Sequence, residues 1–306
     1  MPCFSHVVEE QSSKSVRLDC YISENLQLLS RSQIKARNLK VKINGKDVKL
    51  SRLIKYKDHL DIQWDDVPLP ELIAQDIPLN IIYEDERCIV VNKKQGMVVH
   101  PGAGNRQGTL ANALYYRRLN MNAGVITESL RPGIVHRLDK ETSGIIIAAY
   151  NDETHAFLAE QFKTRNVKKN YIAIVHGTPK DIKGRIETCL ARDPKNRKRF
   201  TVSANGKNSL TFYKVIKNWK NYSLLLLRPR TGRTHQLRVH LRHIGHPILG
   251  DPVYGSADRQ FKDATLMLHS KSLSITLPGE KEERVFSSIL PERFISIMEK
   301  LDKENI

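Results

Sequence analysis

The sequence predicts an α+β fold: a mixed, mainly antiparallel sheet flanked by helices and loops, preceded by a small N-terminal α+β domain. Short apolar or alternating segments outnumber the amphipathic helical segments along the 306 residues. The turns between these segments are short, which favours antiparallel pairing. The length suggests two domains, and an apolar content of 40% is enough for a sizeable core.

The N-terminal part begins with a polar stretch, residues 1–14, which we expect to form a flexible arm. A compact unit should follow over residues 15–65. Its pattern predicts two helices, of which the second opens on a Ser30 and Gln33 capping box. It also predicts a hairpin around the tight turn Asn44-Gly45. The helices are expected at 16–26 and 30–39, the hairpin strands at 41–43 and 48–50, and one more strand at 60–64.

A linker is expected at residues 66–80, because Asp65–Asn80 contains three prolines and several acids. A second domain should then span 81–295, with a C-terminal tail at 296–306. Glycines mark its turns, with Asn205-Gly206 between two strands and Gly245 as a helix stop. Strands are expected at 89–91, 97–99, 172–175, 200–202, 210–213 and 222–227, and helices at 152–164 and 234–244.

The segment from Gly133 to Gly144 contains the most informative residues of the chain. It places the carboxylate of Asp139 among the basic residues Arg137, Lys140 and His136, ahead of an apolar run. Neighbouring cations favour the ionised form of a carboxylate, which a nucleophilic or base-acting aspartate needs. An aspartate on a basic loop is more often a solvated ion pair, so this segment alone leaves both interpretations open.

The charge balance indicates a polyanionic partner. The formal net charge is +17, with 50 Lys and Arg against 33 Asp and Glu, and between Arg31 and Lys57 ten basic residues surround one acid, Asp47. Phosphate contact explains this excess better than solubility does. No apolar run is long enough to span a membrane, so nucleic acid is the expected partner. Four separated cysteines predict reduced thiols in the cytoplasm and no cysteine metal site.

The N-terminal unit resembles the small alpha-L RNA-binding domain through Leu29-Ser30-Arg31-Ser32 and through Val41 to Gly45. The resemblance covers about fifty residues. It implies a module that binds structured RNA by its shape and its phosphates. The candidate RNA-binding residues are Arg31, Lys35, Arg37, Lys40, Lys42 and Lys46.

Four motifs of the second domain resemble the RluA/RluD family of pseudouridine synthases over residues 79–290. They are the stretches 133–144, 169–177, 228–251 and 266–269. The stretch from Asn92 to Gly96 also contributes to the resemblance. The resemblance implies an enzyme that isomerises uridine in large-subunit ribosomal RNA or its precursor after flipping the base. It implies no cofactor and no metal, because the uracil never has to depart.

The resemblance also implies roles for particular residues. Asp139 matches the essential aspartate, Tyr171 the tyrosine that packs on the target base, and Arg233 the arginine that pairs with the catalytic carboxylate. Arg137 matches the arginine that enters the space left by the flipped base, and Leu268 an apolar residue under the base. Two further arginines of a basic hairpin are candidate substrate-binding residues, Arg192 and Arg197.

Three alternatives remain open at this stage. The protein could be a non-catalytic RNA-binding factor of ribosome assembly, or a synthase acting on transfer RNA. The histidines within residues 235–246 also suggest a metal-dependent RNA hydrolase, although nearby arginines would repel a cation. These histidines are His235, His240, His243 and His246. We expect a monomer.

Overall fold

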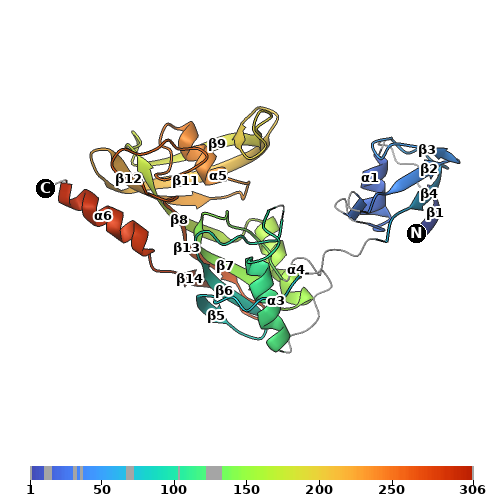
Figure 1. The fold of residues 1–306 in the computed structure, drawn as a ribbon, viewed down its shortest axis with the longest axis horizontal. Coiled ribbons are helices and arrows are strands. Elements are labelled where there is room, and N and C mark those ends of the chain that lie inside the picture. The colour runs from blue at the N-terminus through green and yellow to red at the C-terminus, as the bar shows by residue number, and fades with distance from the viewer. Residues whose placement is uncertain are drawn as a thin grey trace. The chain divides into compact units, whose positions relative to one another are not determined.

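A computed structural model describes residues 2–9, 16–29, 33–34, 37–66, 72–102, 104–121 and 133–304. The chain forms two compact units, Met1–Glu71 and Leu72–Ile306 (Figure 1). Each unit combines a sheet with helices, and almost all strand pairs of the larger unit are antiparallel. The predicted α+β class is therefore confirmed. None of the helices in the described ranges is both long and apolar enough to cross a membrane.

The smaller unit is a four-stranded antiparallel sheet in the order β1-β4-β2-β3, with a short helical segment packed on it. The predicted turn at Asn44-Gly45 joins β2 to β3. Helical residues Gln33 and Ile34 fall in the second predicted helix, whose capping serine, Ser30, lies outside the described residues. The elements are β1 Cys3–Val7, α1 Leu18–Cys20, the π-helical turn η1 Tyr21–Asn25, β2 Lys40–Ile43, β3 Lys46–Asp47 and β4 His59–Gln63.

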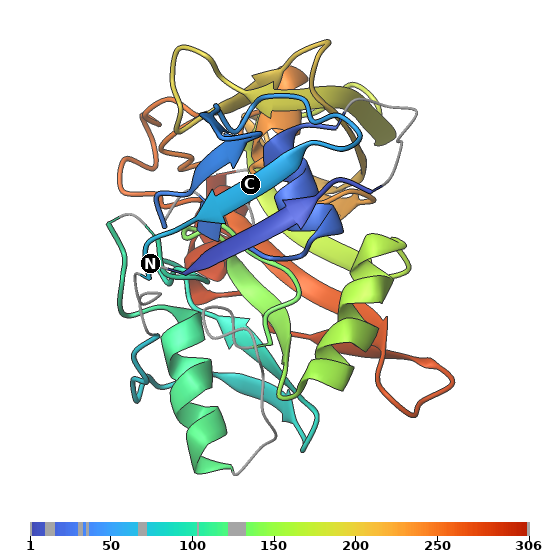
Figure 2. The same cartoon turned by 90° about the vertical axis from the view of Figure 1, so that its right-hand side faces the viewer.

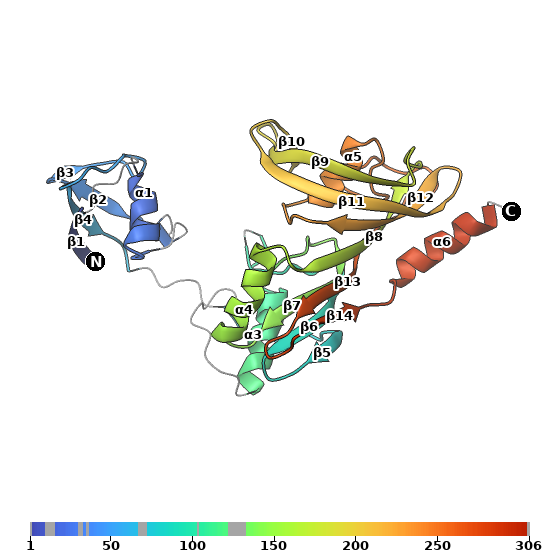
Figure 3. The ribbon, with the colours of Figure 1, turned by 180° about the vertical axis from the view of Figure 1, so that it is seen from behind.

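The larger unit is built on one ten-stranded sheet, in the order β10-β9-β11-β12-β8-β13-β7-β6-β5, with β14 paired to β13 (Figure 3). Its strands are β5 Ile81–Glu84, β6 Cys88–Lys93, β7 Ser143–Ala149, β8 Lys168–His176, β9 Lys183–Arg192, β10 Phe200–Val202, β11 Lys207–Asn218, β12 Tyr222–Pro229, β13 Leu268–Thr276 and β14 Glu283–Ser287. Its helices are α3 Leu110–Asn120, α4 Asp152–Lys163, α5 Gln236–His243 and α6 Glu292–Glu304.

Strand β7 explains the apolar run that follows the Asp139 segment, because it is buried on both faces. Successive side chains of a strand point to opposite faces. Ile145 and Ile147 accordingly join a core with Leu158 of α4, while Ile146 joins a core with Leu114 of α3. Figure 2 shows α3 and α4 on either side of β7. The Asp139 segment is thus anchored to the centre of a two-sided core.

Gly144 lets β7 approach β13, the one parallel neighbour in the described sheet. Its φ is +115°, and a Cβ atom there would lie 2.2 Å from the backbone oxygen of Ser270. Any other residue would therefore have to push the two strands apart.

Several expectations differ from the structure. The expected arm at residues 1–14 is in part a strand, because β1 pairs with β4 over Cys3–Val7. Residues 48–50 are not a strand, since β3 ends at Asp47. The linker ends earlier than residue 80, because Leu72 is buried in the larger core and the Gln75 amide donates to the Asn112 carbonyl at 3.2 Å. Residues 97–99 are not a strand, since the carbonyls of Val98 and Val99 instead accept the first amides of α3. The tail at 296–306 is mostly the helix α6, whose apolar face packs into the core through Phe294, Ile297 and Leu301.

Candidate active site

The backbone around Asp139 is held by a buried lysine. Lys93, at the end of β6, is 2% exposed, and its Nζ donates to the carbonyls of Lys94, Met97 and Lys140 at 3.0, 2.9 and 3.2 Å. Burial lowers the pKa of Lys93 to about 8. Three carbonyls satisfy the three protons of the ammonium group. Because one of these carbonyls belongs to Lys140, the residue after Asp139, the lysine fixes the loop that carries the carboxylate.

The Asp139 carboxylate has two basic neighbours, and both come from the segment around α5. Arg238 Nη1 lies 3.5 Å from Oδ2, and His235 Nε2 lies 3.9 Å from the same oxygen. Arg238 is itself fixed by two bonds of 2.7 Å to Asp251 and by the ring of Tyr254 at 5.1 Å. Both approaches are to Oδ2, so among the described residues Oδ1 is left free to act on a substrate.

The structure places Arg238, not Arg233, beside Asp139, so the predicted charge partner was wrong. Arg233 lines the same cavity, but its Nε donates to the Asn208 carbonyl at 3.2 Å and its backbone amide to Gln236 Oε1 at 3.0 Å. A sequence signal for Arg238 existed. It lies next to Leu237 and three residues before Leu241 on the buried side of the helix, where an arginine needs an acidic partner.

His136 also differs from expectation, because it is not a cation beside Asp139. Its ring stacks on Phe162 with centroids 4.5 Å apart, and its Nε2 accepts the Ile147 amide at 3.1 Å. Burial lowers the pKa of His136 to about 3, so the imidazole is neutral at pH 7. Both His136 and Phe162 line the cavity.

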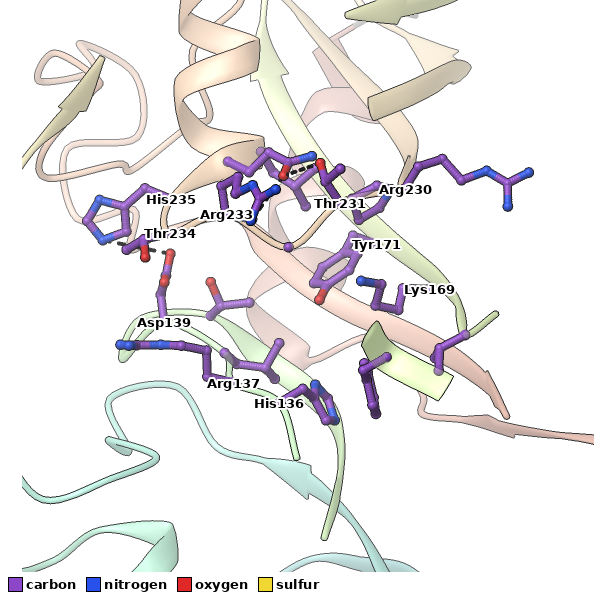
Figure 4. A pocket seen from close by; sticks show the side chains of 18 of the residues that line it. His136, Arg137, Asp139, Lys169, Tyr171, Arg230, Thr231, Arg233, Thr234 and His235 are labelled. Atoms are coloured by element: carbon purple, nitrogen blue, oxygen red, sulfur yellow. Dashed lines mark hydrogen bonds and ion pairs between the residues drawn. The ribbon is translucent and has the colours of Figure 1, made fainter. Parts of the chain in front are cut away.

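Tyr171 lies in β8 with its ring in the cavity, close to Asp139 in Figure 4. Burial raises the pKa of its hydroxyl to about 12, so it stays protonated at neutral pH and is a poor base. An aromatic face offered to a base is the better use of this side chain. Leu268, the first residue of β13, lines the same cavity.

The cavity that contains these residues has a volume of about 460 Å³ (Figure 4). It brings together five of the predicted residues, which are Asp139, Tyr171, Arg233, Arg137 and Leu268. Arg192 and Arg197 are not part of its lining. Arg192 is the last residue of β9 and Arg197 lies in the loop that follows, and Arg192 Nη1 donates to the Arg197 carbonyl at 3.0 Å.

Lys169 is a cavity residue that the sequence interpretation missed. It lies two residues before Tyr171 on β8, and burial lowers its pKa. In Figure 4 its side chain lies next to the Tyr171 ring. The alternation of a strand would have placed both residues on one face, so the pattern Lys169-Asn170-Tyr171 contained the signal.

The predicted histidine cluster does not converge on one point. His240 is buried and contacts the hydroxyls of Thr188, Ser209 and Thr211. His246 Nδ1 contacts the His176 carbonyl at 2.9 Å. Among the residues that the structure describes, no three metal-binding side chains gather in a group. These histidines therefore give no support to a metal-dependent hydrolase.

Comparison with known proteins connects this cavity to one reaction. Residues 87–243 match the family model described as RNA pseudouridylate synthase. The chain is 45% identical over 298 residues to ribosomal large subunit pseudouridine synthase D of Borreliella burgdorferi, covering 95% of this chain and 91% of the relative. It is 43% identical to the protein of that name from Zymomonas mobilis, covering 79% and 78%.

Solved structures agree with this similarity. The human RNA pseudouridylate synthase domain containing 4 superposes with a TM-score of 0.59 at 26% identity, covering 73% of this chain and 93% of that one. The human RNA pseudouridylate synthase domain containing 1 superposes with a TM-score of 0.56 at 27% identity, covering 75% of this chain and 96% of that one. All residues that line the cavity around Asp139, except Leu268, lie within the matched range, and the chain belongs to the RNA pseudouridylate synthase family.

Proposed function

We propose that this protein isomerises uridine to pseudouridine in large-subunit ribosomal RNA or its precursor, with Asp139 acting on the ribose. The observation that supports this role is that Asp139 is the only acid among the described residues lining the cavity. Its volume of about 460 Å³ falls within the range of roughly 300–1,000 Å³ that is typical of small-molecule sites. The names of the similar bacterial proteins support the ribosomal substrate.

The reaction breaks the bond between uracil and ribose, turns the base and forms a new bond through carbon 5. A flipped uridine would present its base to Tyr171 and its ribose to Asp139, at a cost of a few kcal/mol for unstacking. The carboxylate can attack carbon 1 of the ribose, or take the proton from carbon 2. Both routes need an anion, and Arg238 stabilises that charge at 3.5 Å.

Cations around the cavity supply the attraction for the RNA backbone. Besides Asp139, the charged residues of the lining are all basic: Arg137, Lys163, Arg165, Lys169, Arg230, Arg233 and Arg238. Basic residues that converge on a site favour phosphate. In this proposal Arg137 enters the space that the flipped base leaves in the RNA stack. Arg192 and Arg197 contact the flanking RNA.

The smaller unit is proposed to bind structured RNA. Lys40 and Lys42 alternate with buried Val41 and Ile43 on β2, so both lysines point outward, and Lys46 is exposed on β3. Arg37 is partly buried. The remaining two candidates, Arg31 and Lys35, lie outside the described residues. The unit would add affinity, and the enzyme would act as a monomer in the cytoplasm.

Tritium release tests the function and the aspartate together. RNA labelled at carbon 5 of uridine releases tritium when pseudouridine forms. The wild-type protein should release it from a large-subunit stem-loop, and Asp139→Asn should release none while binding the RNA equally well. Equal release from both proteins would refute the role of Asp139. Mapping pseudouridine in cells with and without the gene would identify the RNA, and sites lost only from transfer RNA would refute the ribosomal substrate.

A further inference from the structure

His235 occupies a strained position directly before α5. Its φ is +56° and ψ is +16°, a left-handed conformation that residues other than glycine rarely adopt. Such strain persists only where surrounding contacts hold it, and it is concentrated at functional sites. Here the ring lies edge-on to Tyr254, with centroids 5.5 Å apart, and to Phe200 at 5.8 Å. The conformation aims the imidazole between Tyr254 and Asp139.

The hydrogen bonds of Tyr254 determine which nitrogen of His235 carries a proton. The Phe200 amide donates to the Tyr254 hydroxyl oxygen at 2.8 Å, and His235 Nδ1 lies 2.8 Å from the same oxygen. Tyr254 is only 1% exposed, so its own proton needs an acceptor within the protein. Within the described ranges, His235 Nδ1 is the acceptor in reach. The hydroxyl therefore donates to Nδ1.

A neutral imidazole has one protonated nitrogen, so the proton of His235 lies on Nε2. Burial lowers the pKa of His235, although Asp139 opposes the effect, and the neutral form predominates. Nε2 is the nitrogen that faces Asp139 Oδ2 at 3.9 Å. Catalytic hydrogen bonds are often long before the substrate is bound and tighten in the complex. The Nε2 proton thus points at the oxygen that Arg238 also approaches.

We propose that His235 is a positioning residue for Asp139: the Tyr254 hydroxyl fixes the Nε2-protonated tautomer, and this N–H orients the carboxylate so that Oδ1 faces the ribose. The proposal rests on the proposed role of Asp139. It also links the site to the basic loop after β9. Phe200, the first residue of β10, donates to Tyr254, the Tyr254 hydroxyl bonds His235 Nδ1, and His235 Nε2 approaches Asp139 at 3.9 Å.

Two substitutions by amide residues test the two ring nitrogens of His235 one at a time. In His235→Gln the side-chain amide nitrogen reaches the position of Nε2 and can still donate to Asp139. In His235→Asn the amide reaches only the position of Nδ1, beside Tyr254. Asparagine also suits the left-handed backbone better than most residues, so a loss of activity in this variant cannot come from added backbone strain. Thermal melting of both variants checks that they fold.

Tritium release with a stem-loop RNA is measured for each protein, together with its KM. We expect His235→Asn to lower kcat by about 10- to 100-fold, the size of effect that a misplacement of about 1 Å produces. KM should stay within about twofold. His235→Gln should recover most of the loss. A kcat for His235→Asn equal to that of wild type, a change confined to KM, or a glutamine variant as poor as the asparagine variant would overturn the proposal.

The tautomer is measured without any reaction, by ¹⁵N NMR of histidine-labelled protein, with His235→Asn identifying the signal. The wild-type protein should show the proton on Nε2, and Tyr254→Phe should lose this preference. A proton on Nδ1 in the wild type would overturn the proposal even if no substrate were turned over. If Asp139→Asn is inactive and His235→Asn is fully active, the positioning role fails alone. An active Asp139→Asn would instead refute the proposed catalytic residue.

Discussion

The basic residues around Asp139 and those on the surface of the smaller unit serve different physical purposes. Arg238 is buried and fixed by Asp251, and Lys93 is buried and fixed by three carbonyls. Lys40 and Lys42 are exposed on an outer face of β2. Buried cations with fixed partners determine geometry, whereas exposed cations contribute a salt-dependent attraction. The same residue types therefore fix geometry in one region and, in the proposed function, would supply affinity for RNA in the other.

The largest difference is expected for Arg238→Met. The substitution leaves the buried carboxylate of Asp251 without its two bonds to Arg238, which should cost about 3–5 kcal/mol of unfolding free energy. It also removes the cation beside Asp139, so tritium release should fall to background. Chemical denaturation and tritium release measure the two effects.

Arg233→Met is the matched control for this comparison. Arg233 lines the same cavity but bonds the Asn208 carbonyl through one nitrogen. Its loss should change the unfolding free energy by no more than about 1 kcal/mol and leave measurable turnover. If the two arginine variants were equally damaged, the assignment of Arg238 as the partner of Asp139 would be wrong.

An effect of intermediate size is expected on stability at low pH. It tests the buried histidine His136, which is neutral at pH 7. Burial lowers the pKa of His136 to about 3 from an ordinary value of 6.5. Below pH 6.5 the unfolded chain binds a proton that the folded protein does not, so stability falls as the pH falls toward 3. Between pH 6.5 and 5, His136 should account for about 1–2 kcal/mol. Unfolding by urea at several pH values measures this slope, and His136→Gln should reduce it.

The smallest effect is expected for the double variant Lys40→Gln and Lys42→Gln. If each lysine contacts one phosphate, the slope of log affinity against log salt should become less steep by about 1.4–1.8, at about 0.7 per contact on single-stranded and about 0.9 on double-stranded nucleic acid. The value of kcat should not change. Lys180→Gln with Lys281→Gln, two exposed lysines of the larger unit, removes the same charge. An equal change in both slopes would mean that the smaller unit has no special role in RNA binding.

Sequence patterns predicted best where one local rule decides the structure. The helix expected at 152–164 is α4, Asp152–Lys163, and Gly245, with φ of +83°, follows the end of α5 as expected. The Asn44-Gly45 turn was also correct. Residues 97–99 failed because their carbonyls bond to a helix and a buried lysine, which are contacts that strand propensity does not contain.

The site shows the same division between local and long-range information. Motif resemblance predicted the cavity residues Asp139 and Tyr171, but it assigned the wrong arginine. Arg233 and Arg238 are five residues apart in one basic segment, and the left-handed turn at His235 lies between them. Such a turn is a tertiary feature, because His235 is held by Tyr254 from another part of the chain.

The order of the strands has a consequence for how the protein folds while it is being synthesised. Asp139 precedes β7, Arg238 follows β12, and in the sheet β13 lies between β7 and β8 and pairs with both. Translation produces β13 last of these, at residues Leu268–Thr276. A nascent chain therefore carries both halves of the site before it has the strand that joins them. The described arrangement of Asp139 and Arg238 therefore has to await the synthesis of residues 268–276.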